Sequence, residues 1–207
     1  KPLDYSRIDT VIWMQTSFLG DIILSTAAFR LCNHFFPNRK QIVITTEVGA
    51  QVLQGMPEID QIIVLNKRKS SFLQQYRSLR RDLALVEQSA VVMRPHRSAR
   101  SALLCYMLGI PTVTYQESDL SWLSSVRVSR SFLHHESVRI SLLLEALGPP
   151  RQALLGGQLR LPSRQDQLPE LLAEVGSNFI ALAPGSVWAT KALPANIFAS
   201  ILEGVFA

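Results

Sequence analysis

The turn Ser17-Phe18-Leu19-Gly20-Asp21 holds the residues best suited to chemistry in the first half of the chain. The apolar run Val11–Met14 precedes it and apolar residues at helical spacing follow it, which predicts strand, turn and helix. Open parallel sheets form ligand crevices at this end of a strand. The helix dipole would hold Asp21 ionised, so that its carboxylate could accept a proton from an attacking hydroxyl group. A plain helix cap is the alternative for Asp21, and Ser17 and Gly20 are the other candidate binding residues.

A second turn between a strand and a helix covers residues 184–191, with the sequence PGSVWATK. Its backbone N–H groups, with Ser186, Thr190 and the ammonium group of Lys191, could hold the phosphates of a nucleotide diphosphate. It is not a Walker loop, because no glycine precedes Lys191 and Ala192 follows where that motif has Ser or Thr. An ordinary turn with a surface lysine is the alternative.

A cluster of basic residues follows the apolar run that ends at Met93. Guanidinium groups bind carboxylates and phosphates in bidentate fashion, so this cluster is a candidate site for an anionic substrate. Some of its members could be ordinary surface residues. The four candidates are Arg94, His96, Arg97 and Arg100.

We expect no metal site and no metal cofactor. His134-His135-Glu136 resembles the start of an HExxH zinc helix, but Arg139 occupies the second ligand position. His135 is better interpreted as a polar contact at a helix start. Cys32 and Cys105 lack a CxxC spacing and lie in apolar surroundings, which favours reduced core thiols.

Hydrophobic periodicity predicts an α/β domain of the doubly wound kind over residues 1–150, since strands alternate with helices at short spacing. Gly55 and Gly109 mark two of the helix ends. The predicted strands cover 11–14, 42–46, 62–65, 90–93 and 112–115, and the predicted helices begin after residue 21 and cover 48–53, 70–87, 98–108 and 138–147.

The remaining segments are less regular. Residues 116–137 hold seven serines and isolated apolar residues, which favours a long loop or flap that could be partly helical. Residues 151–177 are predicted to be an interdomain connection with a short helix near 168–175. Residues 178–207 predict one strand (179–183), a loop, and a helix that starts near Pro194. A single unit of this kind cannot close a core, so we expect it to be the start of an incomplete second domain.

Charge favours an anionic partner for the first part of the chain. Residues 1–110 carry 14 Lys and Arg against 8 Asp and Glu, and nine of these basic residues lie within 67–100. Nucleic acid is not expected, because Phe72 and Tyr76 fall on the apolar side of a helix rather than among exposed cations. No apolar run is long enough to span a bilayer and no secretory signal is present, so a cytoplasmic location is expected.

Four segments, in order along the chain, resemble glycosyltransferase family 9, the ADP-heptose:lipopolysaccharide heptosyltransferases. Residues 11–30 resemble its opening strand, S-x-L-G-D turn and helix, and residues 48–65 resemble its N-P-x-V-D stretch. Residues 97–111 and 135–148 resemble an arginine-serine helix ending in Gly-Ile-Pro and an H-x3-R helix. Residues 180–194 resemble its P-G-S-x-x-x-x-K-x-W-P segment. The chain departs from the pattern with Gln15 for Arg, Ala27 for Pro and Leu193 for Trp.

The resemblance implies a GT-B architecture in which two Rossmann-like domains face each other, with the second domain incomplete here. It implies inverting transfer of heptose from ADP-heptose to Kdo or heptose of the lipopolysaccharide inner core, with a lipid A-Kdo acceptor at the inner face of the inner membrane. Asp21 matches the general base, and Thr190 and Lys191 match positions that contact donor phosphate or acceptor. By this likeness the isolated chain should be a poor catalyst.

Two alternatives stay open. The first is a related GT-B glycosyltransferase with another donor or acceptor. The second is a non-catalytic Rossmann-like module whose basic residues bind anionic partners. Salt-dependent binding to DNA or anionic lipid, without binding of a nucleotide sugar, would favour the second alternative.

Overall fold

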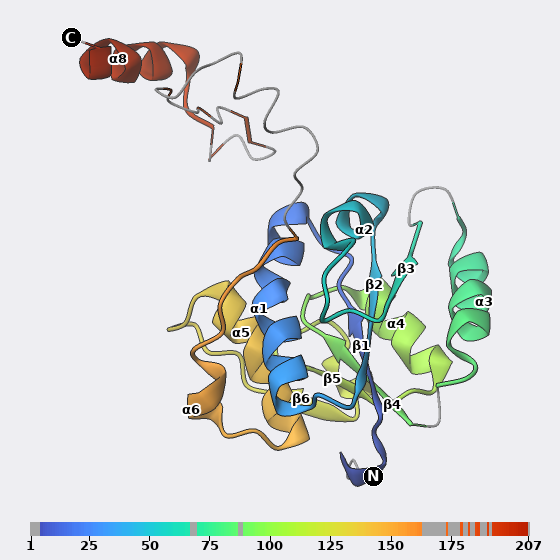
Figure 1. The fold of residues 1–207 in the computed structure, drawn as a ribbon. Helices are drawn as coiled ribbons and strands as arrows, with labels where there is room; N and C mark the ends of the chain where they lie inside the picture. Colours follow the sequence, from blue (N-terminus) through green and yellow to red (C-terminus); the bar gives the residue numbers. More distant parts are fainter. Residues whose placement is uncertain are drawn as a thin grey trace. The chain divides into compact units, whose positions relative to one another are not determined.

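The computed structural model describes residues 5–66, 70–86, 89–162 and 192–206, together with the single residues 173, 179, 182, 185, 186 and 190. The chain forms two compact units, Lys1–Pro162 and Ser163–Ala207, which are described separately. The first unit contains a complete sheet with helices on both faces (Figure 1).

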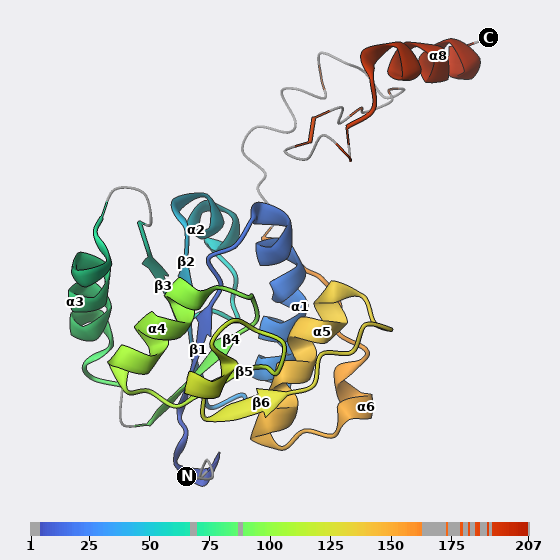
Figure 2. The same cartoon turned by 180° about the vertical axis from the view of Figure 1, so that it is seen from behind.

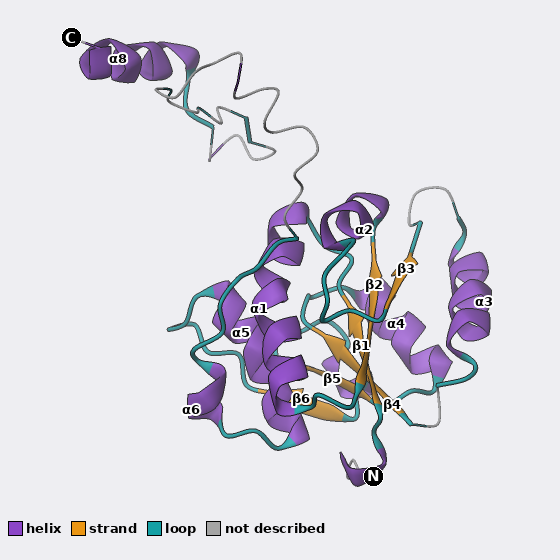
Figure 3. Ribbon diagram, viewed as in Figure 1, coloured by secondary structure: helices purple, strands orange, loops and turns teal. Residues whose placement is uncertain are grey.

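Six strands form the sheet of the first unit, in the order β3-β2-β1-β4-β5-β6, and every neighbouring pair is parallel (Figure 3). Ile12 lies opposite Ile42 on one side and Val92 on the other, so β1 and β4 occupy the centre. The strands are β1 (Thr10–Met14), β2 (Lys40–Thr45), β3 (Gln61–Val64), β4 (Ala90–Arg94), β5 (Thr112–Tyr115) and β6 (Val126–Val128).

Helices cover both faces of the sheet, as Figures 1 and 2 show from opposite sides. The first unit contains α1 (Leu19–Phe35), α2 (Glu47–Leu53), α3 (Phe72–Leu83), α4 (Ala99–Leu108), α5 (Glu136–Leu142) and α6 (Arg151–Leu154), with short 3-10 turns η1 (Tyr5–Arg7), η2 (Ser121–Leu123) and η3 (Leu143–Leu147). Because both faces are covered, the central strands β1 and β4 are buried along their whole length and are apolar except for Thr10 and Arg94.

The alternation of side chains along β1 divides the core into two layers. Trp13 packs in the layer under α1 and α5, where its ring meets Phe29 edge to face with 5.2 Å between centroids. Ile12 and Met14 pack in the other layer, under α3 and α4. The predicted α/β doubly wound class and its five strands are confirmed, as are the helix ends near Gly55, Gly109 and Gly148.

The prediction of a loop over 116–137 was wrong in one respect, because this segment supplies the edge strand β6. With only three residues, of which Arg127 is exposed, β6 has too short a pattern for periodicity to reveal. Helix α3 ends at Leu83, before the predicted end at residue 87.

The first unit extends past residue 150 because the chain after α6 packs along α1. A Cβ at Gly157 would lie 2.8 Å from the Leu31 side chain and 3.3 Å from that of Ala27, so a larger residue there would require the Leu31 side chain to move. The backbone N–H of Arg160 donates to Thr26 Oγ1 at 3.2 Å.

In the second unit, α8 (Ala195–Phe206) confirms the helix predicted to start near Pro194. The predicted short helix at 168–175 and strand at 179–183 fall mostly outside the described residues. Among the helices that the structure describes, none has the length and apolarity required to cross a bilayer.

Candidate active site

A pocket of about 370 Å³ lies at the carboxyl ends of β1 and β4. These strands are neighbours at the point where the strand order reverses, since β2 and β3 lie on one side and β5 and β6 on the other. Open α/β sheets bind ligands at this switch point, because the loops after the two strands diverge there. Along the chain the lining residues form two groups: the first wall is Gln15, Ser17, Asp21 and Leu24, and the second wall is Pro95, His96, Arg97, Arg130, Glu136 and Ile140.

Asp21 is the third residue of α1 and lines the pocket. The residue before α1 is Phe18, whose side chain caps nothing. The Asp21 carboxylate has no hydrogen bond or ion pair with any described residue, so the helix-cap alternative is wrong for this side chain. A half-buried carboxylate without a partner among the described residues is available to a ligand in the pocket.

Gln15 anchors the turn beneath Asp21. Its Nε2 donates to Ser25 Oγ at 2.6 Å and to the Asp21 carbonyl oxygen at 3.3 Å, which ties the end of β1 to the first turns of α1. Its Oε1 accepts from the Ser17 hydroxyl at 2.7 Å. Gln15 is buried, so these bonds are shielded from competing water.

The second wall of the pocket is basic. Arg97 is exposed and forms an ion pair with Asp119 at 3.6 Å. The guanidinium group of Arg130 binds both carboxylate oxygens of Glu136, at 3.1 and 2.9 Å. Arg139 binds the same carboxylate at 2.9 Å, so two cations share one anion and this wall keeps an excess of positive charge.

His96 joins the two walls, because its Nε2 lies 3.1 Å from Thr16 Oγ1. The two residues follow β4 and β1 respectively. Their contact ties together the loops that diverge at the switch point, and it places His96 in the pocket as the sequence suggested.

Arg94 corrects the predicted set of binding residues. Its side chain is fully buried, and it donates to the carbonyl oxygens of His96, Ser98 and Asp119 at 3.2, 3.4 and 3.2 Å. Burial removes hydration from the guanidinium group and lowers its pKa. Arg94 therefore braces the loops behind the pocket and is not available to a substrate.

Arg100 and Gly20 also lie outside the pocket lining. Arg100 extends from α4 to α3, where its Nε and one Nη bind Gln75 Oε1 at 3.2 and 3.0 Å and its guanidinium lies over Phe72. Gly20 is exposed in the first turn of α1, and a Cβ there would meet nothing within 4 Å. Of the acceptor-side candidates, the structure brings together Ser17, His96 and Arg97 with Asp21.

Sequence reasoning missed three polar residues of the pocket. Gln15 appeared only as a departure from a motif, and Glu136 only within a rejected zinc pattern. Arg130 lies in the segment predicted to be a loop, and no local signal marks it. The contact of His135 with the N–H of Ser137 at the start of α5 confirms the interpretation of that histidine as a polar contact.

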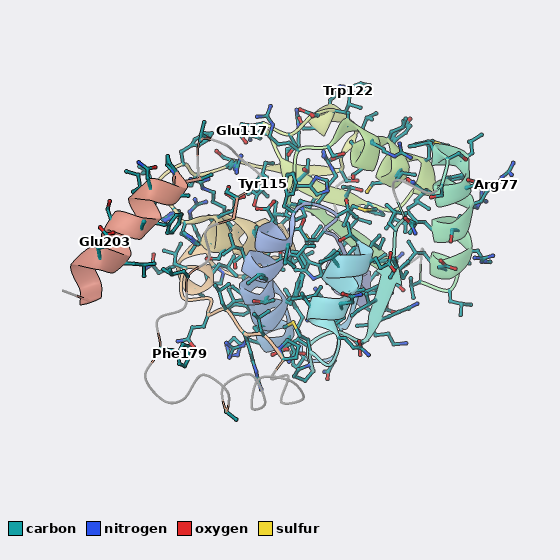
Figure 4. All side chains as sticks on the ribbon, turned by 90° about the horizontal axis from the view of Figure 1, so that it is seen from above. Arg77, Tyr115, Glu117, Trp122, Phe179 and Glu203 are labelled. Atoms are coloured by element: carbon teal, nitrogen blue, oxygen red, sulfur yellow. The ribbon has the colours of Figure 1, made fainter. Side chains whose placement is uncertain are left out.

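The basic residues of α3 do not belong to this pocket. Figure 4 looks down on the carboxyl ends of the strands and shows Arg77 on the outer side of α3, directed away from the sheet, with Tyr115 near the middle. Arg80 and Arg81 are exposed on the same helix.

The candidate phosphate-binding residues belong to the second unit. Ser186 and Thr190 are exposed there, and Lys191 lies outside the described residues. Their role therefore stays a prediction.

No protein-family model and no curated protein matches the chain. Among solved structures, the chain is similar to a family 9 glycosyl transferase from Veillonella parvula, with a TM-score of 0.78 and 20% identity over 99% of this chain and 60% of that one. It is also similar to E. coli ADP-heptose LPS heptosyltransferase II, with a TM-score of 0.64 and 18% identity over 95% and 61% of the two chains. A third structure, E. coli heptosyltransferase WaaC with ADP, gives a TM-score of 0.60 and 18% identity over 69% and 48%.

This chain thus spans about three fifths of the length of the first of these proteins. The likeness is one of fold, and the six-stranded parallel sheet with its central switch point is the part described in full. The resemblance to the family 9 glycosyltransferases, drawn from four sequence segments, is confirmed as a resemblance in fold.

Proposed function

We propose that this chain supplies the acceptor-side domain, and the start of the nucleotide-sugar domain, of an inverting glycosyltransferase. The whole protein would transfer heptose from ADP-heptose to Kdo or heptose of the lipopolysaccharide inner core. The main support is the Asp21 carboxylate, which lines the switch-point pocket and has no partner among the described residues. Structures of E. coli WaaC with ADP and with ADP-2-deoxy-2-fluoro heptose support the choice of donor.

Asp21 would act as the general base. Its carboxylate takes the proton of the acceptor hydroxyl as the hydroxyl oxygen attacks the anomeric carbon of the donor. The bond between that carbon and the diphosphate oxygen breaks, and ADP leaves with the bonding electron pair. Attack opposite to the leaving group inverts the anomeric centre, and Asp21 then releases the proton to solvent.

Ser186, Thr190 and Lys191 would hold the donor diphosphate from residues 178–207. The Lys191 ammonium group and the amino terminus of the following helix would offset the negative charge that develops on the departing diphosphate. This step needs no metal ion in our proposal.

The basic wall would hold the anionic part of the acceptor. Arg97 and His96 line the same pocket as Asp21, and a carboxylate or phosphate of a lipid A-Kdo acceptor suits this charge. A lipid-linked acceptor would also bring the protein to the inner face of the inner membrane.

The test is a transfer assay with the full-length protein, ADP-heptose and a Kdo-bearing lipid A acceptor, with donor binding measured by calorimetry. We expect donor binding and heptose transfer. Donor binding without transfer would point to another acceptor. Absence of both, with salt-dependent binding to anionic lipid or DNA, would replace the enzyme with the non-catalytic alternative.

A further inference from the structure

Gln15 fixes the direction of a chain of hydrogen bonds at the pocket. Its amide has one donor end and one acceptor end, and the structure determines which is which. The end near the Asp21 carbonyl oxygen, at 3.3 Å, must be the NH2 group, because a carbonyl can only accept. The same NH2 group donates to Ser25 Oγ, whose own hydroxyl donates to the Asp21 carbonyl at 2.7 Å.

The other end of the amide is therefore the oxygen Oε1, which lies 2.7 Å from Ser17 Oγ. An amide oxygen can only accept, so the single hydroxyl proton of Ser17 is committed to Gln15. Toward the pocket, Ser17 Oγ then offers lone pairs and no proton. The neighbouring Asp21 carboxylate, when ionised, also offers only lone pairs.

We infer that Gln15 is a positioning residue that makes Ser17 a hydrogen-bond acceptor, so that Ser17 accepts from a second hydroxyl group of the acceptor sugar, beside the hydroxyl that gives its proton to Asp21. A sugar hydroxyl can donate to this wall, whereas a carboxylate or phosphate can only accept and would meet lone pairs and negative charge. The anionic part of the same substrate is directed to the second wall, which contains Arg97 and Arg130. The pocket thereby fixes which end of the substrate faces Asp21.

This inference rests on the proposed function, and one of its tests does not depend on catalysis. Neutron diffraction from crystals exchanged into D2O would locate the deuterium of the Ser17 hydroxyl. The inference expects it between Ser17 Oγ and Gln15 Oε1. A deuterium directed from Ser17 into the pocket would overturn the inference, whatever reaction the protein performs.

The kinetic test uses the full-length protein with the acceptor that it glycosylates. Ser17→Ala removes the acceptor atom, and we expect kcat/KM for the acceptor substrate to fall about tenfold, the worth of one hydrogen bond. Gln15→Met, which keeps the length and charge of the side chain, frees the Ser17 proton and should give a loss of similar size. ADP binding should be unchanged in both variants.

The double variant Gln15→Met/Ser17→Ala separates positioning from general support of the fold. Because Gln15 acts through Ser17, we expect the double variant to lose no more than Ser17→Ala alone. Losses that multiply, or a Ser17→Ala variant with full kcat/KM, would overturn the inference while leaving the proposed function intact. No transfer by the wild-type protein would overturn the proposed function and the ligand assigned here.

Ser101→Ala is the matched control. Its hydroxyl is buried on α4 and has no hydrogen-bond partner in the described structure, and Ser101 does not line the pocket. We expect its kinetics to match those of the wild type, and thermal melting of every variant would report any loss of folded protein.

Discussion

At the residue scale, burial separates the residues that bind from those that support. Arg94 and Arg97 are three positions apart and look equivalent in the sequence, but Arg94 points into the protein and Arg97 into solvent at the pocket. Strand β4 ends between them, and this difference in environment gives the two guanidinium groups different tasks. Sequence spacing could place both at the switch point, but it could not distinguish their directions.

Arg94→Met should lower the stability of the fold. The substitution leaves three backbone carbonyl oxygens without their charged donor, and we expect the free energy of unfolding to fall by about 3 kcal/mol. Urea unfolding followed by circular dichroism measures the change. Arg77→Met is the control, because that side chain is exposed on the outer side of α3 and its loss should cost about 0.5 kcal/mol or less. Equal effects of the two substitutions would contradict the supporting role of Arg94.

At the element scale, the long alternating pattern of strands and helices was predictable because each helix buries one face against the sheet and the central strands are buried on both faces. The site was predictable as far as the turn at Asp21, since a turn after a predicted parallel strand lies at the carboxyl end of the sheet, where open α/β sheets bind ligands. The contribution of Arg130 and Glu136 to the pocket was not predictable from the sequence, because it depends on where β6 and α5 pack in the fold. That placement comes from tertiary packing of a three-residue edge strand, which leaves no periodic signal.

Two glycines at helix ends allow a test of which positions require the backbone freedom of glycine. Gly109 ends α4 with φ +73°, a conformation that costs other residues about 1 kcal/mol, so Gly109→Ala should destabilise the fold by that amount. Gly20 begins α1 with an ordinary backbone and open space around it, so Gly20→Ala should be neutral or stabilise by about 0.5 kcal/mol. Thermal melting of both variants measures the difference. Destabilisation by Gly20→Ala would show that the first turn of α1 is constrained in a way the structure does not reveal.

At the scale of the whole molecule, each layer of the core buries one thiol, Cys32 in one and Cys105 in the other. The stability of the fold should therefore fall at alkaline pH. Burial raises the pKa of Cys32 and of Cys105 from 9.0 to about 12, and burial also raises the pKa of Tyr115. Between pH 9 and 12 the unfolded chain releases thiol protons that the folded chain keeps. Stability is therefore fully present below pH 9 and is lost as the pH rises toward 12.

The slope of stability against pH tests this burial. Urea unfolding at pH 8 to 10.5 should show stability falling above pH 9, with each thiol contributing up to about 1.4 kcal/mol per pH unit. The double variant Cys32→Ala/Cys105→Ala should show a shallower slope, whatever its absolute stability. An unchanged slope would mean that the two thiols ionise alike in the folded and unfolded chains.

The central claim is that Asp21 is the base of a sugar transfer at the switch-point pocket. The most direct test is to measure kcat of the full-length protein carrying Asp21→Asn. Asp82→Asn, on α3, is the control for the loss of a carboxylate elsewhere. We predict a fall in kcat of about a hundredfold or more for Asp21→Asn, with ADP binding and melting temperature retained, and wild-type kcat for Asp82→Asn. Full transfer activity in Asp21→Asn would contradict the account.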